Sequence, residues 1–96
     1  MLDRKTILEQ LAANAPKLHA MGARSLALFG SFARDEGRPD SDVDLLVDLD
    51  LHTFDRFMDL KLWLEDLLGR AVDLVLLDGL KDRVRDKILR EAIRAA

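Results

Sequence analysis

Three short apolar runs constrain this chain to a small buried sheet. They read SLALF at residues 25–29, DVDLLVDL at 42–49 and AVDLVLL at 71–77. Each run has the length of a strand and is rich in leucine and valine, which is typical of strands covered by other elements. The first run stops at Gly30 and the third at Asp78 and Gly79, so turn residues bound them.

Segments with helical spacing surround the three runs. From Asp3 to Ala20, apolar residues recur at intervals of three and four, and this pattern stops near Gly22. Thr53 is a candidate N-cap for a later helix that Gly69 ends. The expected helices span residues 3–20, 31–36, 53–68 and 81–94. This order of elements predicts an α/β or α+β fold around a small sheet.

The segments that connect the three apolar runs determine whether neighbouring strands are able to lie parallel or antiparallel. A helix between the second and third runs allows those strands to lie parallel, and the shorter link between the first two permits an antiparallel pair. The pattern of residues leaves both arrangements open.

Length and composition restrict the function classes. A chain of 96 residues is expected to form one domain, residues 1–96. It has no cysteine, a net charge of -3 and a concentration of carboxylates between Asp40 and Asp59, which disfavours direct nucleic-acid binding through a basic face and favours multivalent cations as ligands. Because no apolar stretch has the length of a membrane span or a signal peptide, no membrane association and a cytoplasmic location are expected.

Two acids in the second run suggest a metal site. Side chains alternate along a strand, so Asp42 and Asp44 are expected on one face while Val43 points into the core. Two neighbouring carboxylates repel each other unless a cation compensates them, and Mg²⁺ commonly uses one or two carboxylates together with substrate phosphates.

Asp73 is a third acid in the same kind of setting. It lies inside the third apolar run, where a charged residue needs a reason to be present. If that strand lies beside the second, Asp73 completes a cluster of three carboxylates suited to two-metal phosphoryl transfer.

The end of the first run has features of an anion site. Gly30 allows a ligand to approach the backbone, and Ser31 offers a hydroxyl and N–H groups at the start of a helical turn. Arg34 follows one turn later and is able to reach the same phosphates. Taken singly, each feature also has a structural explanation, such as a helix cap or a solvated strand edge. Their combination in one short stretch favours a common site.

These residues resemble a known family. Gly30 and Ser31, ten further residues and then Asp42, Val43 and Asp44 match the signature of the DNA polymerase β-type nucleotidyltransferase superfamily. The flanking text, LFGSFAR and PDSDVDLLV, is similar to its minimal nucleotidyltransferase (MNT) branch, and the likeness runs from about residue 25 to residue 77. The resemblance implies a small mixed sheet flanked by helices, with a fold like the polymerase β palm.

The resemblance also implies the roles of the site residues. It implies ATP as substrate and Mg²⁺, expected as two ions, as cofactor. The expected nucleotide-binding residues are Gly30, Ser31, Arg34 and Ser41, and the expected catalytic and metal-binding residues are Asp42, Asp44 and Asp73. Asp73 would orient or deprotonate the acceptor. Many relatives have glycine directly after the arginine, whereas here Asp35 and Glu36 precede Gly37, which changes the loop that follows.

Short members of this branch resemble antitoxins of HEPN/MNT toxin–antitoxin pairs. The resemblance then implies transfer of AMP from ATP to a tyrosine hydroxyl of a partner HEPN ribonuclease toxin, which neutralises that toxin. The chain contains no tyrosine, so such an acceptor would belong to another protein. In the helix expected over 53–68, Leu62, Trp63 and Leu68 extend the apolar surface beyond one face, which suggests an interface with a toxin or a second copy.

Two alternatives to this enzyme remain. A non-catalytic antitoxin would neutralise its toxin by complex formation alone, and substitution of Asp42 or Asp44 would then leave neutralisation intact. A transferase that modifies a small molecule is the other alternative, although no acceptor pocket is evident in the sequence. Three mutually repelling acids on one face favour a catalytic function, because a passive binder has no physical need for them.

Overall fold

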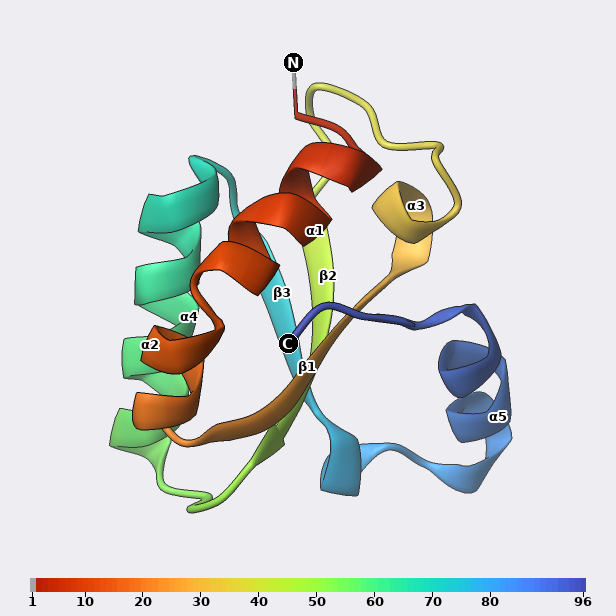
Figure 1. Ribbon diagram of the computed structural model, residues 1–96. Coiled ribbons are helices and arrows are strands. Elements are labelled where there is room, and N and C mark those ends of the chain that lie inside the picture. Colours follow the sequence, from red (N-terminus) through yellow and green to blue (C-terminus); the bar gives the residue numbers. More distant parts are fainter. Residues whose placement is uncertain (1) are drawn as a thin grey trace.

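A four-stranded mixed sheet forms the centre of the computed structural model, which describes residues 2–96 (Figure 1). The strands are β1 (Ala23–Phe29), β2 (Val43–Leu49), β3 (Val72–Leu76) and β4 (Ile93–Arg94). The helices are α1 (Arg4–Ala13), α2 (Ala15–Ala20), α3 (Gly30–Ala33), α4 (Phe54–Leu68) and α5 (Asp82–Glu91), with a 3-10 turn, η1, at Leu77–Gly79. This architecture confirms the expected class of a small mixed sheet flanked by helices.

The sheet has the strand order β3-β2-β1-β4. β1 and β2 are antiparallel, whereas β2 and β3 are parallel and are connected by α4. Both arrangements that the connection lengths allowed are therefore present. β4 pairs antiparallel with the other edge of β1.

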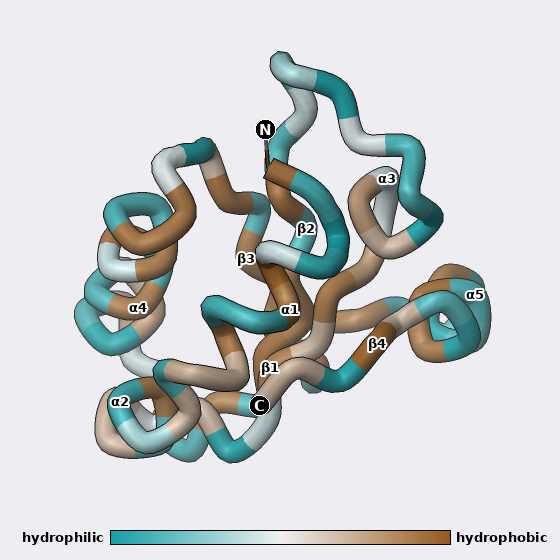
Figure 2. Tube along the Cα trace, turned by 45° about the horizontal axis from the view of Figure 1, so that its top comes forward, coloured by the Kyte–Doolittle hydropathy of each residue, from teal (hydrophilic) through white to brown (hydrophobic). Residues whose placement is uncertain are grey.

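The core lies between the sheet and helices α1, α2 and α4, which cover the same face in Figure 1. Val43, Leu45 and Val47 of β2 point into this core, while Asp44 and Asp48 alternate to the opposite face. Figure 2 shows the strands as a hydrophobic centre between helices with mixed surfaces. Burial of this one face therefore determines that the acidic side chains lie on the other, more open face.

The single helix expected over residues 3–20 is instead two helices. α1 ends at Ala13 and α2 begins at Ala15, with Asn14 between them at φ -105° and ψ 15°. Pro16 explains the break, because it has no N–H to donate to the carbonyl four residues earlier and its ring crowds that carbonyl. The Asn14 side chain donates to the Gln10 carbonyl at 2.8 Å and so caps the first helix.

The helix expected over residues 81–94 is also shorter than predicted. α5 ends at Glu91, and Ala92 adopts extended dihedral angles that lead into β4. Ile93 and Arg94 then pair with Leu28 and Ala27 of β1. This pairing satisfies backbone groups on an edge of β1 that would otherwise be exposed.

Helix α4 begins and ends as expected. The Thr53 hydroxyl accepts a hydrogen bond from the Arg56 N–H at 3.2 Å, and Gly69 ends the helix in the left-handed conformation. Leu68 is buried, whereas Leu62 is 54% exposed, so only part of the additional apolar surface remains open. Among residues 2–96, no helix is sufficiently long and apolar to cross a membrane.

Glu65 joins α4 to the start of β3, which gives a first testable prediction. Its Oε2 accepts hydrogen bonds from the Val72 N–H and the Lys61 ammonium, both at 2.9 Å, and these bonds hold the pKa of Glu65 below its usual range. We expect Glu65→Gln to lower the melting temperature at pH 7. Since a lowered pKa in the folded state stabilises the protein only above the unfolded pKa, the difference should disappear as the pH falls below about 4. Thermal unfolding across this pH range measures the difference, with Glu9→Gln, at an exposed position of α1, as the control.

A shift of the same size in Glu9→Gln, or a difference between wild type and Glu65→Gln that persists in acid, would contradict this account. The first result would point to a general charge effect, and the second to a contact that does not depend on ionised Glu65.

Candidate active site

Three acids lie at one end of the open face of the sheet. Asp44 is on β2, and the parallel register places it directly opposite Asp73 on β3. The charge of Asp73 raises the pKa of the Asp44 carboxyl, so the two carboxylates interact across the strands. Asp42 lies just before β2, outside the strand, and its side chain is exposed. The structure therefore brings Asp44 and Asp73 to neighbouring positions on adjacent strands, with Asp42 as a nearby charge.

The electrostatics of the site centre on Asp44. Burial raises the pKa of its carboxyl, and the charges of Asp73 and Asp42 raise it further, to about 6. The guanidinium charge of Arg34 acts in the opposite direction and lowers the pKa of Asp44. Burial and neighbouring negative charge therefore both disfavour the ionised form of Asp44.

Gly30 lies directly against the Asp44 carboxylate. A Cβ at position 30 would overlap Oδ2 of Asp44 and would lie 2.8 Å from its Cγ. Gly30 also has φ +75°, in the left-handed region that favours glycine. Position 30 thus needs glycine both for its backbone conformation and for the close approach of Asp44.

The carboxylate of Glu91 accepts hydrogen bonds from both Gly30 and Arg34. Its Oε1 accepts a hydrogen bond from the Gly30 N–H at 3.0 Å, and Arg34 Nη1 donates to its two carboxylate oxygens at 3.3 and 3.1 Å. Arg34 Nε donates to Glu36 at 3.1 Å. Sequence reasoning missed Glu91, because nothing in the spacing of residues connects position 91 with position 30. We refer to the Gly30 N–H and the Arg34 guanidinium together as the anion cradle.

Ser41 lies in the loop between α3 and β2, directly before Asp42. The Ser41 hydroxyl accepts a hydrogen bond from the Arg38 N–H at 2.9 Å, and Arg70 donates to the carbonyls of Arg38 and Ser41 at 3.1 and 3.0 Å. In this structure Ser41 therefore holds the turn that precedes Asp42. Its expected contact with a nucleotide stays a prediction.

The start of this loop shows how the chain accommodates Asp35 and Glu36. Asp35 adopts φ 63°, a left-handed conformation that aspartate tolerates better than most residues. Gly37 packs against the Phe32 ring so closely that a Cβ there would overlap it. Ser31 lies within α3 and its carbonyl accepts a hydrogen bond from Glu36 N–H at 2.8 Å.

The acidic residues have the chemistry of a magnesium site. Among residues 2–96, no three histidine or acidic side chains already stand together as a set of metal ligands. The Asp44 and Asp73 pair nevertheless supplies the hard oxygen donors that Mg²⁺ prefers. Burial first, and then the charges of Asp73 and Asp42, raise the pKa of Asp44, and a divalent cation would compensate that negative charge. The donor set therefore fits this ion.

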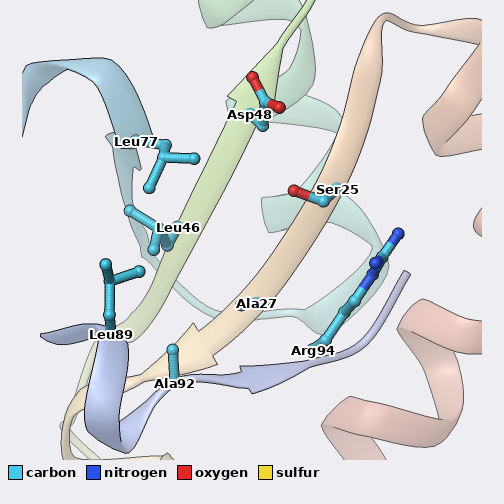
Figure 3. Close-up of a pocket in the computed structure, with 8 residues that line it drawn as sticks. All are labelled: Ser25, Ala27, Leu46, Asp48, Leu77, Leu89, Ala92 and Arg94. Carbon is cyan, nitrogen blue, oxygen red and sulfur yellow. The ribbon is translucent and has the colours of Figure 1, made fainter.

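A cavity of about 250 Å³ opens on the same face of the sheet (Figure 3). Leu46, Leu77 and Leu89 form its apolar part, and Asp48, Ser25 and Arg94 supply polar groups. Leu46 and Asp48 follow Asp44 on the same side of β2, and neither Asp44 nor Asp73 lines the cavity. The open face therefore combines an acidic end with a recess that was not evident in the sequence.

Comparison with known proteins identifies the class. Residues 5–95 match the family model described as a nucleotidyltransferase domain. The chain belongs to this family, and its fold is that of a minimal nucleotidyltransferase. This result confirms the family and the type of enzyme predicted from the sequence.

Individual relatives and solved structures are similar to the chain over most of its length. The chain is 39% identical over 95 residues to the protein adenylyltransferase MntA of Thermococcus cleftensis, covering 97% of this chain and 96% of that relative. A solved structure assigned as a minimal nucleotidyltransferase is 43% identical, with a TM-score of 0.84 and coverage of 96% and 95% of the two chains. A crystallised MntA toxin–antitoxin complex has a chain 25% identical, with a TM-score of 0.64 and coverage of 98% of this chain and 72% of that one.

Proposed function

We propose that this chain is a protein adenylyltransferase that transfers AMP from ATP to a tyrosine hydroxyl of a partner HEPN-type toxin and thereby neutralises it. The observation that carries the proposal is that Asp44 lies opposite Asp73 in the strand register and against Gly30, which joins an acidic pair to an anion cradle. A site that combines oxygen donors for a cation with N–H donors for an anion suits the transfer of a nucleotide.

In the proposed reaction, the acceptor oxygen attacks the α-phosphorus of ATP. An oxygen–phosphorus bond forms to AMP, the bond to the β-phosphate breaks, and pyrophosphate leaves. The Gly30 N–H and the Arg34 guanidinium hold the phosphates, because both are donors directed to one position. A carboxylate oxygen of Asp73, which is exposed on β3, accepts the proton of the acceptor hydroxyl.

The same acids would hold Mg²⁺. When bound by Asp42, Asp44 and Asp73, the ion would lower the pKa of the acceptor hydroxyl and neutralise the charge of the leaving pyrophosphate. Asp44 is the central ligand in this assignment, because it lies between Gly30 and Asp73.

Two observations support a protein as acceptor. The Thermococcus relative that matches nearly the whole chain is a protein adenylyltransferase, and the chain itself has no tyrosine to modify. The open face also leaves Asp73 accessible to a side chain of a partner. Similarity to a chain of an MntA toxin–antitoxin complex supports a toxin as that partner, and the HEPN type follows from the family resemblance.

A labelling experiment tests this function. The purified chain is incubated with Mg²⁺, ATP labelled at the α-phosphate, and a candidate HEPN-type partner protein. We expect label to enter the partner, and replacement of its acceptor tyrosine with phenylalanine to prevent labelling. Omitting Mg²⁺ or labelling ATP at the γ-phosphate should leave the partner unlabelled, because the transferred group is AMP.

A parallel assay of toxicity separates this enzyme from a binding antitoxin. If Asp73→Asn abolishes labelling and also abolishes neutralisation of the toxin in cells, catalysis accounts for the effect. If the variant still neutralises the toxin, complex formation alone is sufficient and the non-catalytic alternative holds. Asp66→Asn, on an exposed turn of α4, is the matched control for loss of one charge.

A further inference from the structure

Glu91 is held in the place that the proposed function assigns to phosphate. Its carboxylate accepts from the Gly30 N–H at 3.0 Å and from Arg34 Nη1 at 3.3 and 3.1 Å. Its side chain is only 21% exposed, compared with 45% for Arg34. A carboxylate and a phosphate oxygen compete for the same donors, because both are anionic acceptors of similar hydrogen-bond geometry.

A nucleotide and Glu91 cannot both occupy the anion cradle in this arrangement. The Gly30 N–H has one proton, and that proton is already directed at Glu91 Oε1. A triphosphate would also add several negative charges beside a carboxylate in a region where Asp42, Asp44 and Asp73 are already close. Repulsion among these anions favours displacement of Glu91, because Glu91 lies at the end of α5 and can move away together with that helix.

Helix α5 is attached weakly enough to follow Glu91. The helix has no buried residue, and Val84 and Leu89 on it are 46% and 42% exposed. Within residues 2–96, the hydrogen bonds of Glu91 are the only side-chain hydrogen bonds found between α5 and another element of the fold. The two residue pairs of β4 hold the chain immediately after the helix.

We propose that Glu91 is an internal phosphate substitute, which fills the anion cradle when no nucleotide is bound and leaves it when a triphosphate enters, so that nucleotide occupancy releases α5. The inference rests on the proposed function in one respect, namely that the cradle receives phosphate. Glu91 thereby sets the affinity for nucleotide, and the position of α5 reports whether the cradle is filled. α5 also borders the cavity through Leu89, so its release enlarges the entrance for an acceptor.

Calorimetric titration with inorganic triphosphate tests the competition without any chemistry. We expect Glu91→Gln to bind triphosphate about tenfold more tightly than wild type, because a neutral amide competes less well than a carboxylate for charge-assisted hydrogen bonds. Glu36→Gln is the matched control, since Glu36 also pairs with Arg34 at 3.1 Å but has no contact with Gly30. Its affinity should change by less than about twofold.

The outcomes separate this inference from its alternatives. If Glu91→Gln weakens or does not change triphosphate binding, Glu91 supports the cradle instead of competing for it, and the inference fails. An equal gain in Glu36→Gln would show a general charge effect and would also overturn it. If no variant binds triphosphate, both the inference and the assignment of the cradle in the proposed function are wrong.

Hydrogen–deuterium exchange of the unmodified chain tests the release of α5. Saturating triphosphate should accelerate exchange in residues 82–91, while exchange in α4 stays unchanged. Unchanged or slower exchange in α5 would overturn the coupling. Because neither measurement uses AMP transfer, the inference can hold even if the chain does not modify a toxin, and it can fail even if the chain does.

Discussion

Asp44→Asn is expected to abolish AMP transfer and, in the absence of metal ions, to make the fold more stable. Loss of a central metal-binding carboxylate removes several kcal/mol of transition-state stabilisation, so we expect transfer to fall by about 10³-fold or more. The stability gain follows from the pKa of Asp44, which its surroundings raise to about 6. Because the folded state disfavours the charged form, ionised Asp44 destabilises the protein at neutral pH.

The raised pKa of Asp44 determines how the stability difference between Asp44→Asn and wild type changes with pH. A carboxyl with a raised folded-state pKa costs stability as the pH rises from about 4 to about 6, and the full cost is present above that range. After a discount for the solvent-exposed part of the site, we expect Asp44→Asn to gain about 1–2 kcal/mol at pH 7. Denaturant unfolding in EDTA measures this gain, which should be small at pH 4.

Two comparisons make the result specific to Asp44. Asp66→Asn removes one exposed carboxylate from α4 and should change neither transfer nor the pH dependence. Mg²⁺ should stabilise wild type more than Asp44→Asn, because the variant lacks a charged ligand. A variant that is less stable than wild type at pH 7 in EDTA would show that the acids do not repel one another in the folded protein.

Gly30→Ala is expected to lose activity, though less than Asp44→Asn, and also to lose stability. An alanine Cβ at this position overlaps Asp44 Oδ2, so the carboxylate must move from its place beside the anion cradle. A displacement of about 1 Å at a catalytic group is sufficient to lower a rate by about 10²-fold. The φ of +75° adds a backbone cost of about 1–2 kcal/mol for any residue with a Cβ. Initial rates of AMP transfer and denaturant unfolding measure the two effects.

Gly69→Ala is the matched control for the backbone cost. Gly69 has φ +65°, close to that of Gly30, but a Cβ there would meet no atom within 4 Å. Both variants should therefore lose a similar amount of stability from the left-handed conformation, and only Gly30→Ala should lose transfer activity. Full activity in Gly30→Ala would mean that Asp44 does not need its observed position.

The sequence predicted the three strands that build the site because their patterns are local. Each apolar run is strand length and is bounded by turn residues, and the acids interrupt the runs at positions that alternate with core residues. The approach of Asp73 to Asp44 was conditional on adjacent strands, and the parallel pairing of β2 with β3 meets that condition. The break at Pro16 was missed by the prediction of one helix over residues 3–20, although proline inside a helical pattern is a local signal for it.

The remaining features depend on contacts between distant residues. β4 contains only two residues, and its one apolar residue, Ile93, continues the helical spacing of α5, so nothing local marks the change from helix to strand. Glu91 reaches Gly30 only because β4 pairs with β1 beside it. Asp42 lies outside the strand in which it was expected, since β2 begins at Val43. Local sequence patterns therefore predicted the acidic residues, whereas the pairing of β4 with β1 determines that Glu91 occupies the anion cradle.

The parallel pairing of β2 with β3 has a consequence for how relatives of this chain diverge. Asp44 and Asp73 meet only in the observed register, and a shift of β3 by one residue would turn Asp73 towards the core and Val72 or Leu74 towards the acids. The length of the connection between Gly69 and Val72 therefore determines the register of β3 and, with it, the position of Asp73. We expect insertions and deletions to be rare there during evolution, even though exposed turns usually tolerate them, and to be tolerated more readily between β3 and α5.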